Sequence, residues 1–221
     1  MNSPSAAVGI FGGTFDPVHY GHLRAALEAR EILKLEDFRL LPAGTPPHRS
    51  NTVASGVHRL AMLRLAVAGH SGFRVDDREV RREGNSYMVD TLREIRSETG
   101  DSPLLLIIGQ DAANALDSWH QWRTIFDLAH LVIMRRPESK LAWSGELQNQ
   151  VEHRLARDPL QLRQQAAGLV LGLEVTQLAI SSTGIRNLLL AGRSPRFLLP
   201  DSVIDYIEQN TLYFAAAVRK G

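Results

Sequence analysis

Apolar residues follow two different patterns along the chain, and the two patterns alternate. Short runs of consecutive aliphatic residues are typical of strands buried inside a parallel sheet. The stretches between these runs carry apolar residues every three or four positions, which is typical of amphipathic helices. We predict strands at residues 6–11, 38–42, 104–108, 130–134 and 169–178, with short candidates at 73–75 and 79–81. We predict helices at residues 23–33, 57–68, 87–98, 112–116, 122–128, 183–191 and 201–209.

Strands that alternate with helices indicate βαβ units and a parallel sheet. Right-handed crossovers place the helices on both faces of that sheet. We therefore expect a doubly wound α/β fold of the Rossmann-like type. A chain of 221 residues suits one domain, so residues 1–221 are assigned to a single domain. Within it, residues 137–167 are the least periodic and are rich in Gln, Glu and Arg, which predicts a polar helical excursion on the surface.

Composition and charge exclude several classes of protein. A hydrophobic content of 44% with 22% charged residues is ordinary for a soluble globular protein. The net charge is +1 and the basic residues are scattered, so the electrostatic footprint of nucleic-acid binding is missing. No apolar run approaches the roughly 18 residues of a membrane span, and residues 1–7 lack the basic start of a secretory signal. Without cysteine there is no disulfide framework and no zinc–thiolate site. We expect a cytoplasmic protein, and oligomerisation stays open.

The clearest candidate chemistry follows the first predicted strand. Gly12 and Gly13 allow a tight turn and a close approach of backbone to a ligand. His19 and His22 then flank Gly21 where the first helix begins. Free N–H groups and the helix dipole favour anions at such a place, and imidazoles can donate hydrogen bonds to phosphate oxygens. This arrangement predicts a polyphosphate site; the alternative is a pair of histidines that only cap and fill a surface loop.

Two motifs carry a resemblance to a known family. GGTFDPVHYGHL at residues 12–23 resembles the signature of the nucleotidyltransferase superfamily that contains the H-x-G-H motif. ISSTGIR at residues 180–186 is similar to the element that closes over the ATP phosphates in the same enzymes. Four further elements resemble those of bacterial nicotinate mononucleotide adenylyltransferases, and the likeness extends over nearly the whole chain. They are PPHR at 46–49, NSYM at 85–88, DSWHQW at 117–122 and RRP at 135–137.

The resemblance implies a reaction. The adenylyl group of ATP would be transferred to nicotinate mononucleotide, giving deamido-NAD (nicotinate adenine dinucleotide) and pyrophosphate in NAD biosynthesis. Such chemistry needs positioning and charge stabilisation more than a nucleophilic side chain. Mg²⁺ is expected as a cofactor carried by the ATP phosphates, not by a protein metal site. Two alternatives stay open: phosphopantetheine adenylyltransferase, whose family is shorter and lacks the Trp119 region and the RRP element, and a non-catalytic nucleotide-sensing module of the same fold.

The resemblance also assigns roles to individual residues of this chain. The catalytic residues would be His19, His22 and Arg186. The ATP-binding residues would be Gly12, Gly13, Thr14, Phe15, His22, Gly109, Asp111, Ser182, Thr183 and Arg186. The residues that bind nicotinate mononucleotide would be His48, Tyr87, Met88, Trp119 and Arg136, with Trp119 stacked on the pyridine ring and backbone N–H groups near Tyr87 receiving its carboxylate.

Several of these roles have a structural alternative. Ser182 and Thr183 are of the type that caps a helix, as is Asp111. Trp119 could be a core residue, although Trp122 is the better candidate for the core. Relatives often carry Thr where this chain has Met88, which leaves the preference for acid over amide open if a hydroxyl is needed. Arg135 is an alternative to Arg136 for the acceptor phosphate. The helix dipole disfavours the charged form of His22, so a neutral donor is expected there.

Overall fold

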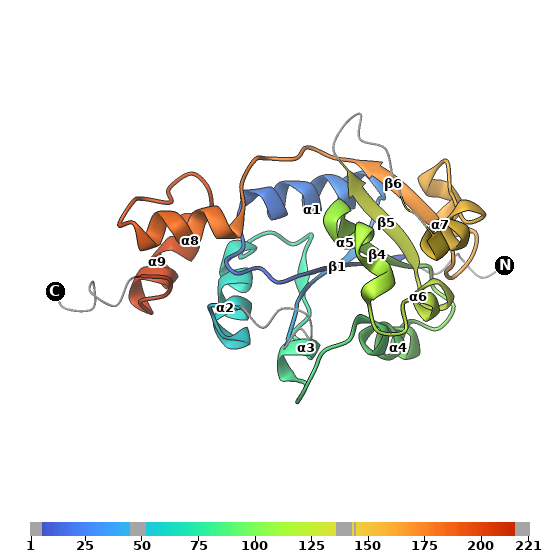
Figure 1. Cartoon of the computed structure of the whole chain (residues 1–221), viewed down its shortest axis with the longest axis horizontal. Coiled ribbons are helices and arrows are strands. Elements are labelled where there is room, and N and C mark those ends of the chain that lie inside the picture. Colours follow the sequence, from blue (N-terminus) through green and yellow to red (C-terminus); the bar gives the residue numbers. More distant parts are fainter. Residues whose placement is uncertain (1–5, 45–51, 136–142, 144, 215–221) are drawn as a thin grey trace.

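The computed structural model describes residues 6–44, 52–135, 143 and 145–214 (Figure 1). Over this part of the chain, six parallel strands form one sheet in the order β3-β2-β1-β4-β5-β6. The strand order reverses between β1 and β4, which creates a crevice at the carboxyl ends of these two strands. The strands are β1 Val8–Gly13, β2 Asp37–Pro42, β3 Arg74–Val75, β4 Leu104–Gly109, β5 His130–Arg135 and β6 Val170–Glu174.

Helices cover both faces of the sheet, as the alternation of patterns predicted. They are α1 Tyr20–Ile32, α2 Gly56–Ala66, α3 Arg78–Arg81, α4 Met88–Thr99, α5 Gln110–Asn114, α6 Trp122–Leu128, α7 Gly145–Glu152, α8 Ser182–Leu190 and α9 Asp201–Gln209, with 3₁₀ turns η1 Leu116–Ser118 and η2 Pro159–Arg163. Figure 1 shows α8 and α9 grouped with α2 at one end of the molecule, while α6 and α7 lie at the other. None of these helices is long and apolar enough to cross a membrane.

Alternate residues of the central strands feed two separate apolar layers, because successive side chains of a strand point to opposite faces. Phe11 and Ile107 belong to the layer beneath α1, α2, α8 and α9. Ile10 and Leu106 belong to the layer beneath α4, α6 and α7. Two buried layers around one parallel sheet are the doubly wound arrangement, so the predicted fold class is confirmed.

The structure corrects the predicted elements in three places. Residues 79–81, expected as a strand, lie in helix α3, where Arg81 N donates to the Asp77 carbonyl at 3.1 Å and Glu79 turns inward. The expected strand at 169–178 is shorter, because only β6 pairs with β5 before the chain leaves the sheet. The first helix begins at Tyr20 and not at Leu23, so His22 is its third residue.

The least periodic region contains α7 and η2 in its described part. Leu147 and Val151 of α7 are buried in the layer beneath that face of the sheet, while the other residues of the helix are polar. The capping box of η2, in which Asp158 accepts from Leu160 N at 2.7 Å, starts the second turn. The excursion is therefore attached to the domain by a narrow apolar stripe.

Candidate active site

The loop after β1 brings the two predicted histidines together. Their rings stack with centroids 3.7 Å apart and an angle of 29° between the planes. The edge of Phe15 meets His22 at a centroid distance of 5.1 Å. Gly21 favours this close stacking, since an added Cβ would lie 3.0 Å from ring atoms of His19, and the ring would have to shift. Phe15 itself is buried and has a φ of 50°, so its side chain supports the loop and only its backbone could reach a nucleotide.

Burial keeps both histidines neutral. It lowers the pKa of His19 to about 4. Burial, and secondly the neighbouring His19, lowers the pKa of His22 to about 3. The neutral form of His22 expected from the helix dipole is therefore favoured mainly by desolvation. Each imidazole can then donate one hydrogen bond without carrying charge.

The Nδ1 atoms of His19 and His22 are buried and have no hydrogen-bond partner among the described residues. A buried polar atom left unpaired costs about 1–3 kcal/mol, so such atoms call for an explanation. The two ring nitrogens are thus polar groups that the described part of the protein leaves unsatisfied.

The second motif docks directly onto this loop. Ser182 Oγ donates to the Pro17 carbonyl at 2.9 Å, and Arg186 Nη1 donates to the Asp16 carbonyl at 2.6 Å. Arg186 Nη2 also donates to Thr183 Oγ1 at 3.1 Å. The two motifs are far apart in the sequence, but these hydrogen bonds join them side by side in the folded protein. The cap of α8 is Ser181, whose Oγ accepts from Gly184 N at 3.1 Å, and not Ser182 or Thr183.

A cavity of about 340 Å³ lies beyond the carboxyl ends of β1, β2 and β4, and we call it the strand-end cavity. Backbone lines much of its floor, and Gly109 leaves open space, because an added Cβ there would meet nothing within 4 Å. The position agrees with the rule that ligands bind at the switch point of an open α/β sheet. Predicted residues that line it are Gly12, Gly13, Thr14, Tyr87, Met88, Gly109, Asp111 and Trp119.

Aromatic side chains form one wall of the strand-end cavity. Trp119 follows η1, lines the cavity and packs against the second apolar layer, so it is half-buried. The Tyr87 ring lies 4.4 Å from that of His120, at an angle of 39°. Trp122 is buried at 6% exposure with the Arg123 guanidinium over its ring, as expected for a core residue. Met88 begins α4, and its Cε would lie 3.0 Å from a Cβ added to Gly12.

Two predicted residues, His48 and Arg136, lie outside the described residues. Arg135, the alternative to Arg136, forms an ion pair with Glu174 at 2.7 Å across β5 and β6. This pairing occupies part of its guanidinium. The assignment of the acceptor phosphate to Arg136 therefore stays a prediction.

Several residues around the site were missed in the sequence. Glu79, Ser86 and His120 line the strand-end cavity, and the His120 ring is tilted against that of Tyr87. Arg59 is fully buried in α2 and donates to the carbonyl groups of Thr14 and Gly44, each at 2.8 Å. Arg59 lies on the apolar face of α2, and a charged residue at such a position could have indicated a buried hydrogen-bonding role. Glu79 was not predicted because residues 79–81 were expected to form a strand and not helix α3.

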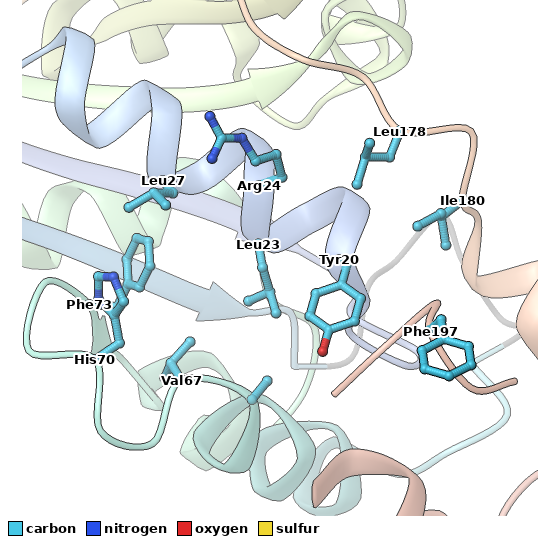
Figure 2. Close-up of a pocket in the computed structure, with 11 residues that line it drawn as sticks. Tyr20, Leu23, Arg24, Leu27, Val67, His70, Phe73, Leu178, Ile180 and Phe197 are labelled. Carbon is cyan, nitrogen blue, oxygen red and sulfur yellow. The ribbon is translucent and has the colours of Figure 1, made fainter. Parts of the chain in front are cut away.

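A second cavity of about 430 Å³ lies beside α1, and its lining is mainly apolar (Figure 2). Tyr20, Leu23 and Leu27 of α1 line it together with Phe73 and Phe197. Tyr20, Leu23 and Ile180 of the two motifs line it, yet it contains none of the residues to which the resemblance assigns a role. We therefore place the candidate active site at the strand ends. The described residues contain no group of three or more His, Cys, Asp or Glu side chains placed to hold a metal ion.

Known proteins resemble this chain in sequence and in fold. A model of the cytidylyltransferase-like family matches residues 10–188. A probable nicotinate-nucleotide adenylyltransferase of Methylococcus capsulatus is 54% identical over 207 residues, covering 93% of this chain and 99% of that protein. One of Acidithiobacillus ferrooxidans is 50% identical over 205 residues, covering 92% and 94%.

Solved structures show the same fold. The nicotinic acid mononucleotide adenylyltransferase of Plasmodium falciparum complexed with NaAD superimposes with a TM-score of 0.71 at 16% identity, covering 94% of this chain and 97% of that chain. The same protein complexed with APC gives a TM-score of 0.69 at 17% identity. At this level of identity the likeness concerns the fold alone.

Proposed function

The chain belongs to the cytidylyltransferase-like family and, within it, to the nicotinate-nucleotide adenylyltransferases, and from this premise we propose that it transfers the adenylyl group of ATP to nicotinate mononucleotide. The products are nicotinate adenine dinucleotide and pyrophosphate. One observation carries the proposal for this chain. The loop after β1 holds a neutral, stacked histidine pair, receives Arg186 of the second motif and contributes Thr14 to the lining of the strand-end cavity.

The reaction forms one bond and breaks one. An oxygen of the acceptor phosphate attacks the α-phosphorus of ATP, and the bond from that phosphorus to the bridging oxygen breaks, so that pyrophosphate leaves with the electron pair. His19 and His22 donate hydrogen bonds to phosphate oxygens on which charge develops. Arg186 offers a planar pair of donors to the leaving pyrophosphate. Because both histidines are neutral, each donates a ring N–H to a phosphate oxygen without carrying a charge of its own.

The acceptor fits the strand-end cavity. Trp119 offers an aromatic surface for the pyridine ring, and Tyr87 lies on the same wall. Helix α4 begins at Met88 with no side-chain cap from Tyr87, so its first N–H groups are available to an anion such as the nicotinate carboxylate. Recognition by backbone N–H groups would tolerate Met88 in place of a hydroxyl residue.

Small molecules are the partners that this proposal requires. Asp111, on the exposed first turn of α5, faces the cavity where ribose hydroxyls of ATP would lie. Mg²⁺ would enter with the nucleotide and reduce the negative charge of its phosphates, since this ion prefers phosphate and water oxygens. The substrates are expected in the cytoplasm, which is where we place the enzyme.

A pyrophosphate-release assay tests the proposal. Purified protein is mixed with ATP, Mg²⁺ and, in parallel, nicotinate mononucleotide, nicotinamide mononucleotide or phosphopantetheine. We expect rapid release with the first, slower release with the second and none with the third. Release with phosphopantetheine alone would assign the protein to that acceptor. ATP binding without release for any acceptor would favour the nucleotide-sensing module.

A further inference from the structure

A hydrogen-bonded cluster lies beneath the loop after β1, and its centre is the carboxylate of Asp16, which is 3% exposed. Asp16 Oδ2 accepts from Val53 N at 2.8 Å, and Asp16 Oδ1 accepts from Ala54 N at 3.2 Å. Oδ1 also accepts from the hydroxyl of Tyr213 at 2.6 Å. Tyr213 is 197 positions away in the sequence, so this contact exists only in the folded protein.

The same residue carries the contact that orients Arg186. The backbone carbonyl of Asp16 accepts from Arg186 Nη1 at 2.6 Å, and Arg186 Nη1 lies 4.0 Å from Asp16 Oδ2. The position of Nη1 therefore depends on where the Asp16 peptide lies, while Nη2 is held by Thr183 Oγ1 at 3.1 Å. That peptide is in turn fixed by the donors to the Asp16 carboxylate, of which Tyr213 is the only side-chain donor among the described residues.

Tyr213 has features that a simple packing residue does not need. It is buried at 6% exposure, lies after α9 and has a φ of 65°, in the left-handed region that costs a non-glycine residue free energy. Phenylalanine would fill the same space in the apolar layer beneath α9. Burial, and then the hydrogen bond to Asp16, raises the pKa of Tyr213, so its hydroxyl stays a donor at any working pH.

We propose that Tyr213 is a positioning residue for adenylyl transfer, which acts by holding Asp16 so that the Asp16 carbonyl aims Arg186 at the polyphosphate of ATP. The inference rests on the proposed function, because it assigns Arg186 to the leaving pyrophosphate. The proposal extends the site to Tyr213, a residue that follows α9 and belongs to neither motif. The effect should fall on ATP and on turnover, while the acceptor, bound beside Trp119, should be bound as before.

The test uses Tyr213→Phe, which removes only the hydroxyl, with Tyr206→Phe as the matched control. Tyr206 lies on α9, and its hydroxyl contacts His58 Nδ1 at 3.0 Å, away from the loop after β1. We expect Tyr213→Phe to lower kcat/KM for ATP about tenfold, a typical effect of one hydrogen bond to a charged group. The KM for nicotinate mononucleotide should change by less than about twofold, and Tyr206→Phe should behave as wild type.

A double-mutant cycle separates positioning from a loss of stability. If Tyr213 acts through Arg186, adding Tyr213→Phe to Arg186→Ala should cause no further loss of kcat/KM for ATP. A merely structural role would give the same fractional loss in both backgrounds, would lower the melting temperature and would overturn the proposal. Unchanged kinetics for Tyr213→Phe in an active protein would also overturn it.

Two further outcomes are distinguishable. If wild-type protein releases no pyrophosphate with any acceptor, the proposed function fails and not the geometry of Tyr213. If Tyr213→Phe does not fold, Asp16→Asn replaces it, because the amide retains the shape of the side chain but offers one acceptor oxygen to the three donors. A folded Asp16→Asn protein with wild-type kcat/KM for ATP would then overturn the inference.

Discussion

Residues that fix the loop after β1 are buried, whereas most side chains around the strand-end cavity are half-buried or exposed. His19, Asp16 and Arg59 have 5%, 3% and 0% of their surface exposed. On the cavity side, Tyr87, Met88 and Trp119 are half-buried, and Asp111 and His120 are exposed. The phosphate end of the site, at the loop after β1, is thus supported by buried residues, whereas the acceptor end, at the strand-end cavity, is lined by side chains that are more exposed to solvent.

This difference fits what each end must do. Transition-state stabilisation requires donors held in place before the charge develops, because moving them during the reaction would cost free energy. Choice of an acceptor requires only a cavity of suitable shape with a few polar groups. Substitutions at the phosphate end should therefore reduce stability or turnover by large factors, and substitutions at the acceptor end should mainly change KM.

The largest effect is expected for Arg59→Met. This change leaves the Thr14 and Gly44 carbonyl groups without their donor and should lower the free energy of unfolding by about 3–5 kcal/mol, since each buried unpaired group costs about 1–3 kcal/mol. Urea denaturation measures the loss. Arg64→Met on the same helix is the control, because Arg64 is 55% exposed in its ion pair with Asp77 and should contribute less than about 1 kcal/mol. Equal losses for both variants would contradict the special role of Arg59.

Next in size are His19→Ala and His22→Ala. Each should lower kcat by about 10²–10³-fold, as for loss of one donor to a developing charge, with little change in the KM for the acceptor. Steady-state kinetics of pyrophosphate release measure both quantities. His70→Ala, beside Phe73 in the cavity next to α1, should leave turnover unchanged. Normal turnover of folded His19 and His22 variants would remove them from the phosphate site.

A smaller effect concerns the dependence of stability on pH. Above pH 6.5 both histidines are neutral in the folded and unfolded states and contribute no slope. Below pH 6.5 both histidines take up protons in the unfolded chain, whereas in the folded protein His19 is protonated only near pH 4 and His22 only near pH 3. The free energy of unfolding therefore falls as the pH falls through this window. The slope approaches about 1.4 kcal/mol per pH unit for each histidine. Urea denaturation between pH 5 and 7.5 should show a shallower slope for the double variant His19→Gln/His22→Gln than for wild type, and equal slopes would show that folding does not lower the pKa of either ring.

The smallest effect is expected at the acceptor end. Trp119→Ala should raise the KM for nicotinate mononucleotide several-fold, since aromatic stacking contributes about 0.5–1.5 kcal/mol beyond area burial. The KM for ATP should stay within experimental error. Trp122→Ala is the contrasting variant, because a buried tryptophan in the core should cost about 3–5 kcal/mol of stability. A stability loss of that size for Trp119→Ala would return Trp119 to the core.

Local patterns in the sequence determined the sheet, most helices and the two motifs. The 3.6-residue period of helices and the short continuous apolar runs of buried strands are properties of each segment, so the strands β1, β2, β4 and β5 could be predicted without knowledge of their neighbours. The glycines at 12, 13 and 21 could also be recognised in the sequence as part of the first motif, because tight turns and close contacts restrict the residue type locally. From these features follow the doubly wound fold and the position of the histidine pair.

Only the tertiary structure decided how that pair is supported. Residues 79–81 were predicted as a short strand. In the structure they belong to α3, where Glu79 turns inward and accepts a hydrogen bond from Thr91 Oγ1 at 2.7 Å. The contacts of Asp16 with Arg186 and Tyr213 join residues 170 and 197 positions apart. Hydrogen bonds between distant segments leave no periodic trace in a sequence, because the partner of a buried polar group is set by how the segments pack and not by their own spacing.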